Sequence, residues 1–253
     1  MARTLKLTLS YDGTEFDGWQ LQPTGRTVQG VLETALFKLT GQPLRPIAAG
    51  RTDAGVHAEA QVLSLDLPDG NTLPCKAFHH GLNALLPPDV AVLEALEVAP
   101  GFNARKAARG KHYRYRVLNR RTRHPLQRRT HYVVFQPLAL AQMQAAAERL
   151  VGEHDFAAFR AADCQCRTTV RKLHRLSIVD LGRGDLVFEV EGTAFLKHMV
   201  RNLVGTLVHV GRGKLSPDDV DRILAGRDRT KAGPTAPPHG LTLVEVRYES
   251  TGG

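Results

Sequence analysis

Leu5-Lys6-Leu7-Thr8-Leu9-Ser10 alternates apolar and polar side chains with a period of two. A strand with this pattern buries one face and leaves the other in solvent, which is typical of antiparallel sheets. A helix is predicted after it, because Thr27 can cap the start of an apolar stripe that ends at Gly41. A strand followed by a helix of this kind predicts a fold in which helices pack against a sheet.

The rest of the chain continues this alternation. Strand patterns follow at residues 61–67, 90–98, 111–118, 131–135, 170–178, 186–190 and 241–248, and helix patterns near 78–86, 140–150, 195–210 and 216–226. None of the strands is the long Val and Ile run of an all-parallel sheet, so we predict two α+β halves with antiparallel sheets. Strand signals lapse at 120–129, and the halves are therefore predicted as domains 1–120 and 121–253.

A loop between two glycines precedes the predicted strand at 61–67. It reads Gly50-Arg51-Thr52-Asp53-Ala54-Gly55-Val56-His57 and sets one carboxylate beside a cation and a hydroxyl. Glycines allow positive φ or a close backbone approach, and loops held by a rigid scaffold often bear reactive side chains. A surface turn in which Asp53 or Thr52 makes only a local hydrogen bond fits the composition equally well. Asp53 is therefore a candidate catalytic residue, with a plain turn as the alternative.

Positive charge is concentrated in one window of this 253-residue chain, whose net charge is +9. No acidic residue lies between Glu97 and Glu148, whereas the window holds 11 cations: Arg105, Lys106, Arg109, Lys111, Arg114, Arg116, Arg120, Arg121, Arg123, Arg128 and Arg129. An unopposed cationic surface attracts polyanions, and Arg suits phosphate binding. A solvated basic face is the alternative. We predict nucleic acid binding, with the RNA backbone contacted by Arg105, Arg109, Arg120, Arg121 and Arg123.

The segment at 111–118 alternates tyrosines with cations. Tyr113 and Tyr115 fall on one face of the predicted strand, and Arg114 and Arg116 fall on the other. A tyrosine beside arginines can stack on a nucleobase, and it can equally well pack in a core. The lone Trp19 is interpreted as packing.

A second cationic cluster lies in the helix predicted at 195–210. Lys197 and Arg201 are four residues apart and would share a helix face, as would His198 and Asn202. The two cations could reach a buried carboxylate such as Asp53, or they could form an exposed basic face.

Several kinds of chemistry lack their motifs here. The sequence has no phosphate-binding loop, serine-hydrolase elbow, zinc-protease motif or zinc-deaminase motif. Its three cysteines, Cys75, Cys164 and Cys166, lack the second ligand pair of a closed zinc site and are predicted to be reduced thiols. No signal peptide or apolar run of about 18 residues is visible. We predict a cytoplasmic protein with no metal site and no membrane segment.

The loop around Asp53 resembles the catalytic motif of the tRNA pseudouridine synthases that modify the anticodon arm. Segments similar to that family occur elsewhere in the expected order: Tyr11-Asp12-Gly13, Gly18-Trp19-Gln20, Tyr113-Arg114-Tyr115, Asp155-Phe156, Phe159-Arg160, and His198-Met199-Val200-Arg201-Asn202 with Val204-Gly205. The resemblance runs from the first strand to Gly240-Leu241 and so covers nearly the whole chain.

The resemblance implies a fold and an activity. The fold would be two RRM-like (ferredoxin-like) halves, whose sheets join into one extended central sheet with helices on one face and a cleft between the halves. The activity would be conversion of uridine to pseudouridine at tRNA positions 38, 39 and 40 of the anticodon stem-loop, with the target base flipped out of its stack. The family also implies a homodimer that needs no metal or organic cofactor.

The resemblance assigns roles to individual residues as well. It implies that Asp53 is the essential carboxylate, that Tyr113 stacks on the target base and later takes part in proton transfer, and that Arg201 pairs with Asp53. Arg51 would contact the RNA and help to hold the flipped nucleotide. The remaining predicted substrate-binding residues are Thr52, His57, Arg114, Lys197 and His198.

Two other functions fit part of the sequence. A non-catalytic RRM-like RNA-binding protein explains the charge and the tyrosines but not the loop around Asp53. An RNA glycosylase could use the same carboxylate, but it would remove the base and change the RNA mass, which isomerisation does not.

Overall fold

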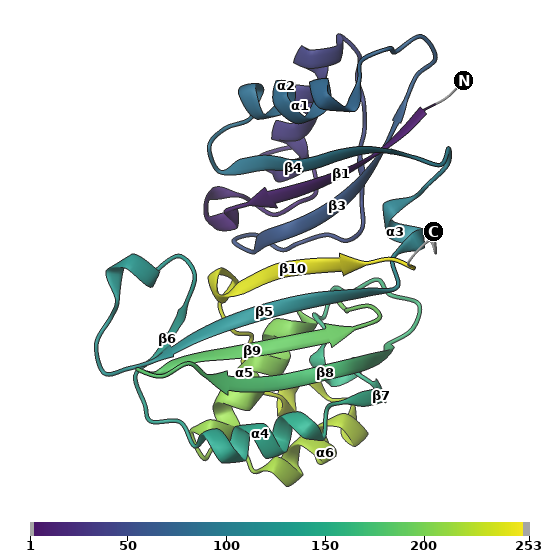
Figure 1. Ribbon diagram of the computed structural model, residues 1–253. Coiled ribbons are helices and arrows are strands. Elements are labelled where there is room, and N and C mark those ends of the chain that lie inside the picture. The colour runs from purple at the N-terminus through teal and green to yellow at the C-terminus, as the bar shows by residue number, and fades with distance from the viewer. Residues whose placement is uncertain (1–2, 250–253) are drawn as a thin grey trace. The chain divides into compact units, whose positions relative to one another are not determined.

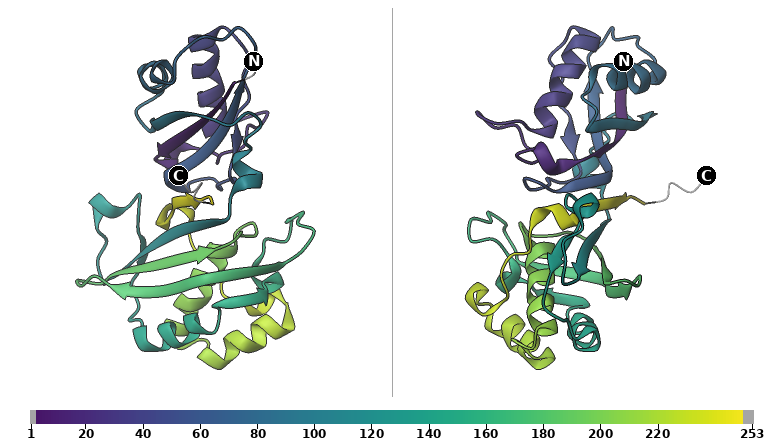
Figure 2. Two further views of the ribbon diagram at one scale, coloured as in Figure 1. Left: turned by 45° about the vertical axis from the view of Figure 1, so that its right-hand side comes forward. Right: turned by 90° about the vertical axis from the view of Figure 1, so that its left-hand side faces the viewer.

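The structure, a computed structural model, describes residues 3–249 and consists of two compact units (Figures 1 and 2). Residues up to Arg109, together with those from Thr242 on, form the first unit, and Gly110–Leu241 forms the second. This division differs from the domains 1–120 and 121–253 expected from the sequence. The strand that carries Tyr113 belongs to the second unit, and the last strand returns to the first, which local signals along the chain do not reveal.

The first unit is built around β1 (Arg3–Tyr11), which lies between β3 (His57–Leu67) and β4 (Val90–Val98) and is antiparallel to both. β2 (Ile47–Ala48) pairs with β3 in the antiparallel sense, and β10 (Leu241–Arg247) pairs with β3 in parallel through Thr242 and Leu243. Leu5, Leu7 and Leu9 are completely buried. The period-two pattern of β1 therefore supplies the core of this unit.

Helices α1 (Val28–Thr40) and α2 (Cys75–Leu85) contact each other, and α2 packs on β4. The Thr27 side chain accepts a hydrogen bond from the Gly30 N–H at 3.2 Å, and Gly41 ends α1 with a φ of 71°. Both helix ends were predicted, because a capping side chain and a left-handed glycine are local signals. The unit also contains the short helices η1 (Gly13–Glu15) and α3 (Ala104–Ala107).

The second unit has the sheet order β5-β9-β8-β7, in which all neighbouring strands are antiparallel. Its strands are β5 (Gly110–Asn119), β7 (Gly152–Asp155), β8 (Val170–Asp180) and β9 (Asp185–Gly192), and β6 (Tyr132–Val134) pairs in parallel with β5. Helix α5 (Met199–Gly211) passes behind β9 and β8 in Figure 1. Helix α4 (Leu140–Glu148) contacts α5, α6 (Pro217–Gly226) and β8. Four short helices complete the unit: η2 (Pro125–Gln127), η3 (Ala157–Phe159), η4 (Arg229–Lys231) and η5 (Pro238–Gly240).

The α+β fold class with largely antiparallel sheets is confirmed, whereas the continuation of both sheets into one and a cleft between the halves stay predictions. Ser216 caps α6 through a capping box with Asp219. The helix predicted at 216–226 ends at Gly226, and Arg227 follows it in the left-handed conformation with a φ of 54°. Within residues 3–249 no helix is long and apolar enough to cross a membrane.

Candidate active site

Asp53 lies in a short loop between β2 and β3 that is closed by hydrogen bonds. The Val56 N–H donates to the Asp53 carbonyl at 3.2 Å, and the Gln61 side-chain amide donates to the Gly50 carbonyl at 2.9 Å. Gly55 has a φ of +75°, a conformation that residues with a Cβ rarely adopt. The loop therefore presents a half-buried Asp53 in one fixed position at the start of β3.

The loop that follows β1 holds the Asp53 loop from a second side. The Trp19 N–H donates to the Thr52 carbonyl, and the Gly55 N–H donates to the Phe16 carbonyl, both at 3.1 Å. The side chains of Trp19 and Phe16 are only 2% and 3% exposed. Trp19 is thus a packing residue, as interpreted from the sequence, and its backbone also fixes the residue next to Asp53.

Two glycines of the same segment allow the two loops to touch. A Cβ on Gly13 would lie 2.0 Å from the Val56 carbonyl oxygen, and one on Gly18 would lie 2.8 Å from the Thr52 carbonyl oxygen and 3.2 Å from the Asp53 carbonyl carbon. Real Cβ atoms essentially never lie within 3.0 Å of another atom, so the contacts at 2.0 and 2.8 Å would force a shift. The position of Asp53 therefore depends on the absence of side chains at Gly13 and Gly18.

Thr52 and His57, predicted to bind substrate, are almost completely buried within the first unit. The Thr52 hydroxyl is hydrogen-bonded to the Tyr11 hydroxyl at 2.8 Å, and Nδ1 of His57 accepts from the Gly13 N–H at 3.1 Å. Burial raises the pKa of Tyr11 to about 12, so this hydroxyl keeps its proton at neutral pH. We infer that Thr52 and His57 shape the loop, whereas Arg51 beside them is exposed.

Tyr113 lies on β5 of the second unit and is 7% exposed. Its ring meets Phe195 edge to face, with centroids 5.1 Å apart and planes at 80°. Tyr115, which shares its face of the strand, is completely buried, and its hydroxyl donates to the Pro237 carbonyl at 2.7 Å. Of the two tyrosines, Tyr115 is therefore a core residue, which leaves Tyr113 as the candidate for stacking.

The polar face of β5 carries the predicted cations, and a carboxylate on β9 binds one of them, Arg114. Glu189 accepts from Arg114 Nε at 2.9 Å and also contacts Nε2 of His112. Arg114 pairs with Glu189 in the strand register, so the two side chains face each other directly. Part of the positive charge that the sequence places on this strand is therefore neutralised inside the unit.

Arg201 lies in the first turn of α5. Its Nε donates to the Ala236 carbonyl at 2.8 Å, and its own carbonyl accepts from the Ala236 N–H at 3.1 Å. These two bonds to one residue fix both the backbone and the plane of the guanidinium.

Lys197 and His198 do not share a helix face with Arg201 and Asn202, contrary to the prediction. The helix begins only at Met199, because His198 takes a left-handed conformation with a φ of 62°. Lys197 lies in the preceding turn, and its Nζ is 2.6 Å from a carboxylate oxygen of Asp163. The two residues thus belong to the loop before α5.

The comparisons with known proteins identify the family. The sequence matches the family profile described as tRNA pseudouridine synthase over residues 8–105 and 146–249. The chain belongs to the tRNA pseudouridine synthase family. The enzyme is therefore an isomerase that converts uridines of tRNA to pseudouridine.

Curated relatives agree over almost the full length. A tRNA pseudouridine synthase A from Myxococcus xanthus is 56% identical over 244 residues, which cover 96% of this chain and 91% of the relative. One from Geobacter sulfurreducens is 51% identical over 246 residues, which cover 97% of this chain and 100% of the relative. A solved chain of a Cbf5-Nop10-Gar1 complex is 12% identical with a TM-score of 0.38, over 94% of this chain and 57% of that chain.

The profile match includes some predicted site residues of the enzyme and omits others. Asp53 and Arg201 lie within the matched residues, whereas Tyr113 and the basic segment at 120–123 lie between the two matched stretches. The predicted role of Tyr113 thus rests on its place on β5 and on the resemblance of its neighbours.

The five predicted backbone-binding arginines differ in how much of the side chain is exposed and what it contacts. Arg105, Arg109, Arg121 and Arg123 are exposed, and Arg109 forms an ion pair with Glu249 at 2.7 Å. Arg120 is less exposed, and its Nε donates to the Arg183 carbonyl at 2.6 Å. Arg105 and Arg109 belong to the first unit and the other three to the second.

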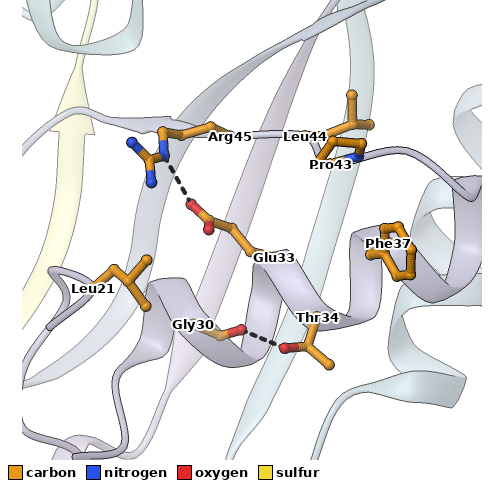
Figure 3. Close-up of a pocket in the computed structure, with 8 residues that line it drawn as sticks. All are labelled: Leu21, Gly30, Glu33, Thr34, Phe37, Pro43, Leu44 and Arg45. Carbon is orange, nitrogen blue, oxygen red and sulfur yellow. Dashed lines mark hydrogen bonds and ion pairs between the residues drawn. The ribbon is translucent and has the colours of Figure 1, made fainter. Parts of the chain in front are cut away.

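A surface hollow of about 590 Å³ lies beside α1. Figure 3 shows Leu21, Phe37 and Leu44 around it, with Arg45 Nε 3.6 Å from a carboxylate oxygen of Glu33. None of the predicted site residues lines it. Within residues 3–249 no group of three or more His, Cys, Asp or Glu side chains is arranged to hold a metal ion.

The sequence reasoning missed the residues that hold the site in place. Tyr11, Gly13 and Gly18 lie in segments similar to the family, but their contacts to the Asp53 loop are tertiary. Ala236, which binds Arg201 twice, carries no chemical signal at all, because it acts through its backbone.

Proposed function

We propose that the enzyme acts on positions 38, 39 and 40 in the anticodon arm of tRNA, with Asp53 as the essential carboxylate. The loop of Asp53 supports this proposal most directly. It holds one half-buried carboxylate in a rigid backbone, next to the exposed cation Arg51. Such a loop does not serve an RNA-binding protein that lacks catalysis.

The reaction sets the chemical requirements of the site. The bond between C1′ and N1 of uridine breaks, the uracil turns, and C5 forms a new bond to C1′. C5 then loses its hydrogen as a proton, and N1 gains a proton. Substrate and product have the same atoms, so neither an oxidant nor an energy source is consumed. An ionised carboxylate can assist by attacking as a nucleophile or by removing a sugar proton, and both routes lead to the same product.

The target base has to leave its stack before Asp53 can act on its nucleoside. Extrusion costs a few kcal/mol, and stacking on an aromatic ring returns about 1 to 3 kcal/mol per base. We assign this stacking to Tyr113 and assign to Arg51 a contact that holds the flipped nucleotide. Arg201 is proposed to pair with the carboxylate of Asp53.

Mapping the modified positions tests the substrate assignment. Purified enzyme is incubated with unmodified tRNA that has uridines at 38 to 40 and elsewhere, and pseudouridine is located by carbodiimide-dependent primer extension. The expected stops fall at positions 38 to 40. Stops confined to another arm of the tRNA would overturn the assignment, and a loss of RNA mass would reveal glycosylase activity instead.

Neutralising the basic segment tests the RNA-binding surface. Replacing Arg120, Arg121 and Arg123 by Gln should weaken tRNA binding and reduce the slope of log K against log salt by about 2 to 3 if all three contact phosphates. The same measurement on a variant with Lys38, Arg45 and Lys76 replaced by Gln, all exposed in the first unit, should leave the slope unchanged. An unchanged slope in the first variant would remove this segment from the interface.

We also propose that the enzyme is a homodimer and that it works in the cytoplasm. The dimer is supported by the resemblance to the family, and the compartment by a substrate, tRNA, that is used in translation there.

A further inference from the structure

Residues 229–240 of the second unit, here called the strap, lie across α5 with their backbone in direct contact. A Cβ on Gly205 of α5 would be 1.7 Å from the Pro234 carbonyl oxygen, and a Cβ on Gly233 of the strap would be 2.6 Å from Cα of Thr206. Neither glycine has a positive φ, so the backbone conformation does not require glycine there. Glycine is needed at both positions because an added Cβ would clash. The strap is thus seated on the helix that carries Arg201.

Arg229 forms hydrogen bonds both within the strap and to α5. Its Nη1 donates to the Gly233 carbonyl at 2.8 Å, and its Nη2 donates to Asn202 Oδ1 at 3.0 Å and to Thr235 Oγ1 at 3.1 Å. All of these acceptors are neutral oxygens. A guanidinium provides such a fork of donors, and an ammonium does not. The side chain therefore organises the strap against α5 and does not neutralise a carboxylate there.

Asn202 is the buried side chain at the centre of this hydrogen-bond network. It is completely buried, its Oδ1 also accepts from the Thr235 hydroxyl at 2.6 Å, and its Nδ2 donates to the Phe159 carbonyl at 2.8 Å. The Thr206 hydroxyl accepts from the Gly233 N–H at 2.9 Å. Buried polar groups are costly when they lose a partner, so this arrangement of the strap is strongly specified.

The next residue of the strap connects the network to Arg201. Ala236 follows Thr235, and its N–H and carbonyl both bond to Arg201. Asn202 follows Arg201 on the helix. The pairs Asn202–Thr235 and Arg201–Ala236 are therefore adjacent rungs between helix and strap, and Arg229 closes the first rung.

We propose that Arg229 is a positioning residue of the synthase, which sets the orientation of the Arg201 guanidinium through Asn202, Thr235 and Ala236 without touching RNA itself. This inference rests on the role of Arg201 in the proposed function. An Arg229 that only stabilised the fold would lower the melting temperature without changing how Arg201 acts.

The first experiment compares turnover with binding. Arg229→Met, and separately the milder Thr235→Val, should lower single-turnover rates by about 10- to 100-fold, the range that a misplacement of about 1 Å can cost. The Kd for tRNA should stay within about twofold of the wild-type value, because the strap is proposed not to contact RNA. Arg149→Met is the matched control, since it removes a cation of the same unit that pairs with Asp218 and Asp221. It should keep the wild-type rate.

The second experiment is a double-mutant cycle with Arg201→Lys, which keeps a cation at the site. If Arg229 acts through Arg201, adding Arg229→Met to Arg201→Lys should cost less than about threefold more, because the two losses are shared. Multiplication of the two losses would overturn the proposal. So would a wild-type rate in both Arg229→Met and Thr235→Val, or a rate loss matched by an equal loss of tRNA affinity.

Separate variants test the roles of Arg201 and Arg229. Full activity in both Arg201→Lys and Arg201→Met would refute the proposed role of Arg201. The positioning role of Arg229 would then be refuted as well. An impaired Arg201→Lys beside an unimpaired Arg229→Met would refute only the positioning role. Circular dichroism and thermal unfolding show whether each variant folds. If Arg229→Met does not fold, the rate and the tRNA affinity of Thr235→Val test the positioning role.

Discussion

The Asp53→Asn variant is expected to form no detectable pseudouridine while it binds tRNA as tightly as the wild-type enzyme does. Asparagine has the size of aspartate and preserves the loop, but it can neither attack C1′ nor remove a sugar proton. Loss of a catalytic side chain lowers the rate by more than about 10⁴-fold in a well-studied serine protease, and a loss of similar size is expected here. Primer extension after carbodiimide treatment measures the product, and filter binding measures the affinity.

Asp66→Asn is the control for this experiment. Asp66 is exposed on β3 of the same unit, and its Oδ1 accepts from the Thr4 hydroxyl at 2.7 Å, a bond that an amide oxygen can keep. This variant should retain full activity. Pseudouridine formed by Asp53→Asn at a rate near that of Asp66→Asn would remove Asp53 from the mechanism.

The Gly13→Ala variant should lose most of its activity although residue 13 bears no reactive group. The added methyl would lie 2.0 Å from the Val56 carbonyl oxygen, so the Asp53 loop or the loop after β1 has to move. Overpacking of this kind costs about 1 to 3 kcal/mol of stability, and a displacement of about 1 Å at a catalytic group can cost 100-fold in rate. Thermal unfolding and single-turnover kinetics measure the two effects.

Gly226→Ala supplies the comparison, because a Cβ there meets nothing within 4 Å. It should be as active as wild type and at least as stable. If Gly13→Ala matched it in both measurements, the contact between the two loops would not control the site.

Local signals in the sequence were sufficient for much of the fold. The strand expected at 90–98 is β4 (Val90–Val98), and α1 begins and ends at the residues that its capping side chain and left-handed glycine indicate. Each of these features depends on residues a few positions apart, so a pattern along the chain can reveal it. The candidate carboxylate Asp53 was found in the same way, from one short loop.

The start of α5 shows where such signals end. Apolar periodicity extends back to Phe195, but the helix begins at Met199 because His198 takes a left-handed conformation. Contacts with another segment accompany this turn: the Ala161 N–H donates to the Lys197 carbonyl at 3.0 Å, and Lys197 pairs with Asp163. Periodicity in sequence contains no information about such partners.

The sequence by itself determined the family, the α+β class and the one carboxylate on which catalysis is proposed to depend, because each is encoded in short motifs and regular spacings. Only the tertiary structure decided which polar side chains near that carboxylate are already engaged, as Thr52 is with Tyr11 and His57 is with Gly13, 44 residues away. It also decided that Arg201 is held by the backbone of Ala236. These partners come together only when the chain folds. A backbone carbonyl is also the same in every residue, so no local sequence pattern can predict these contacts.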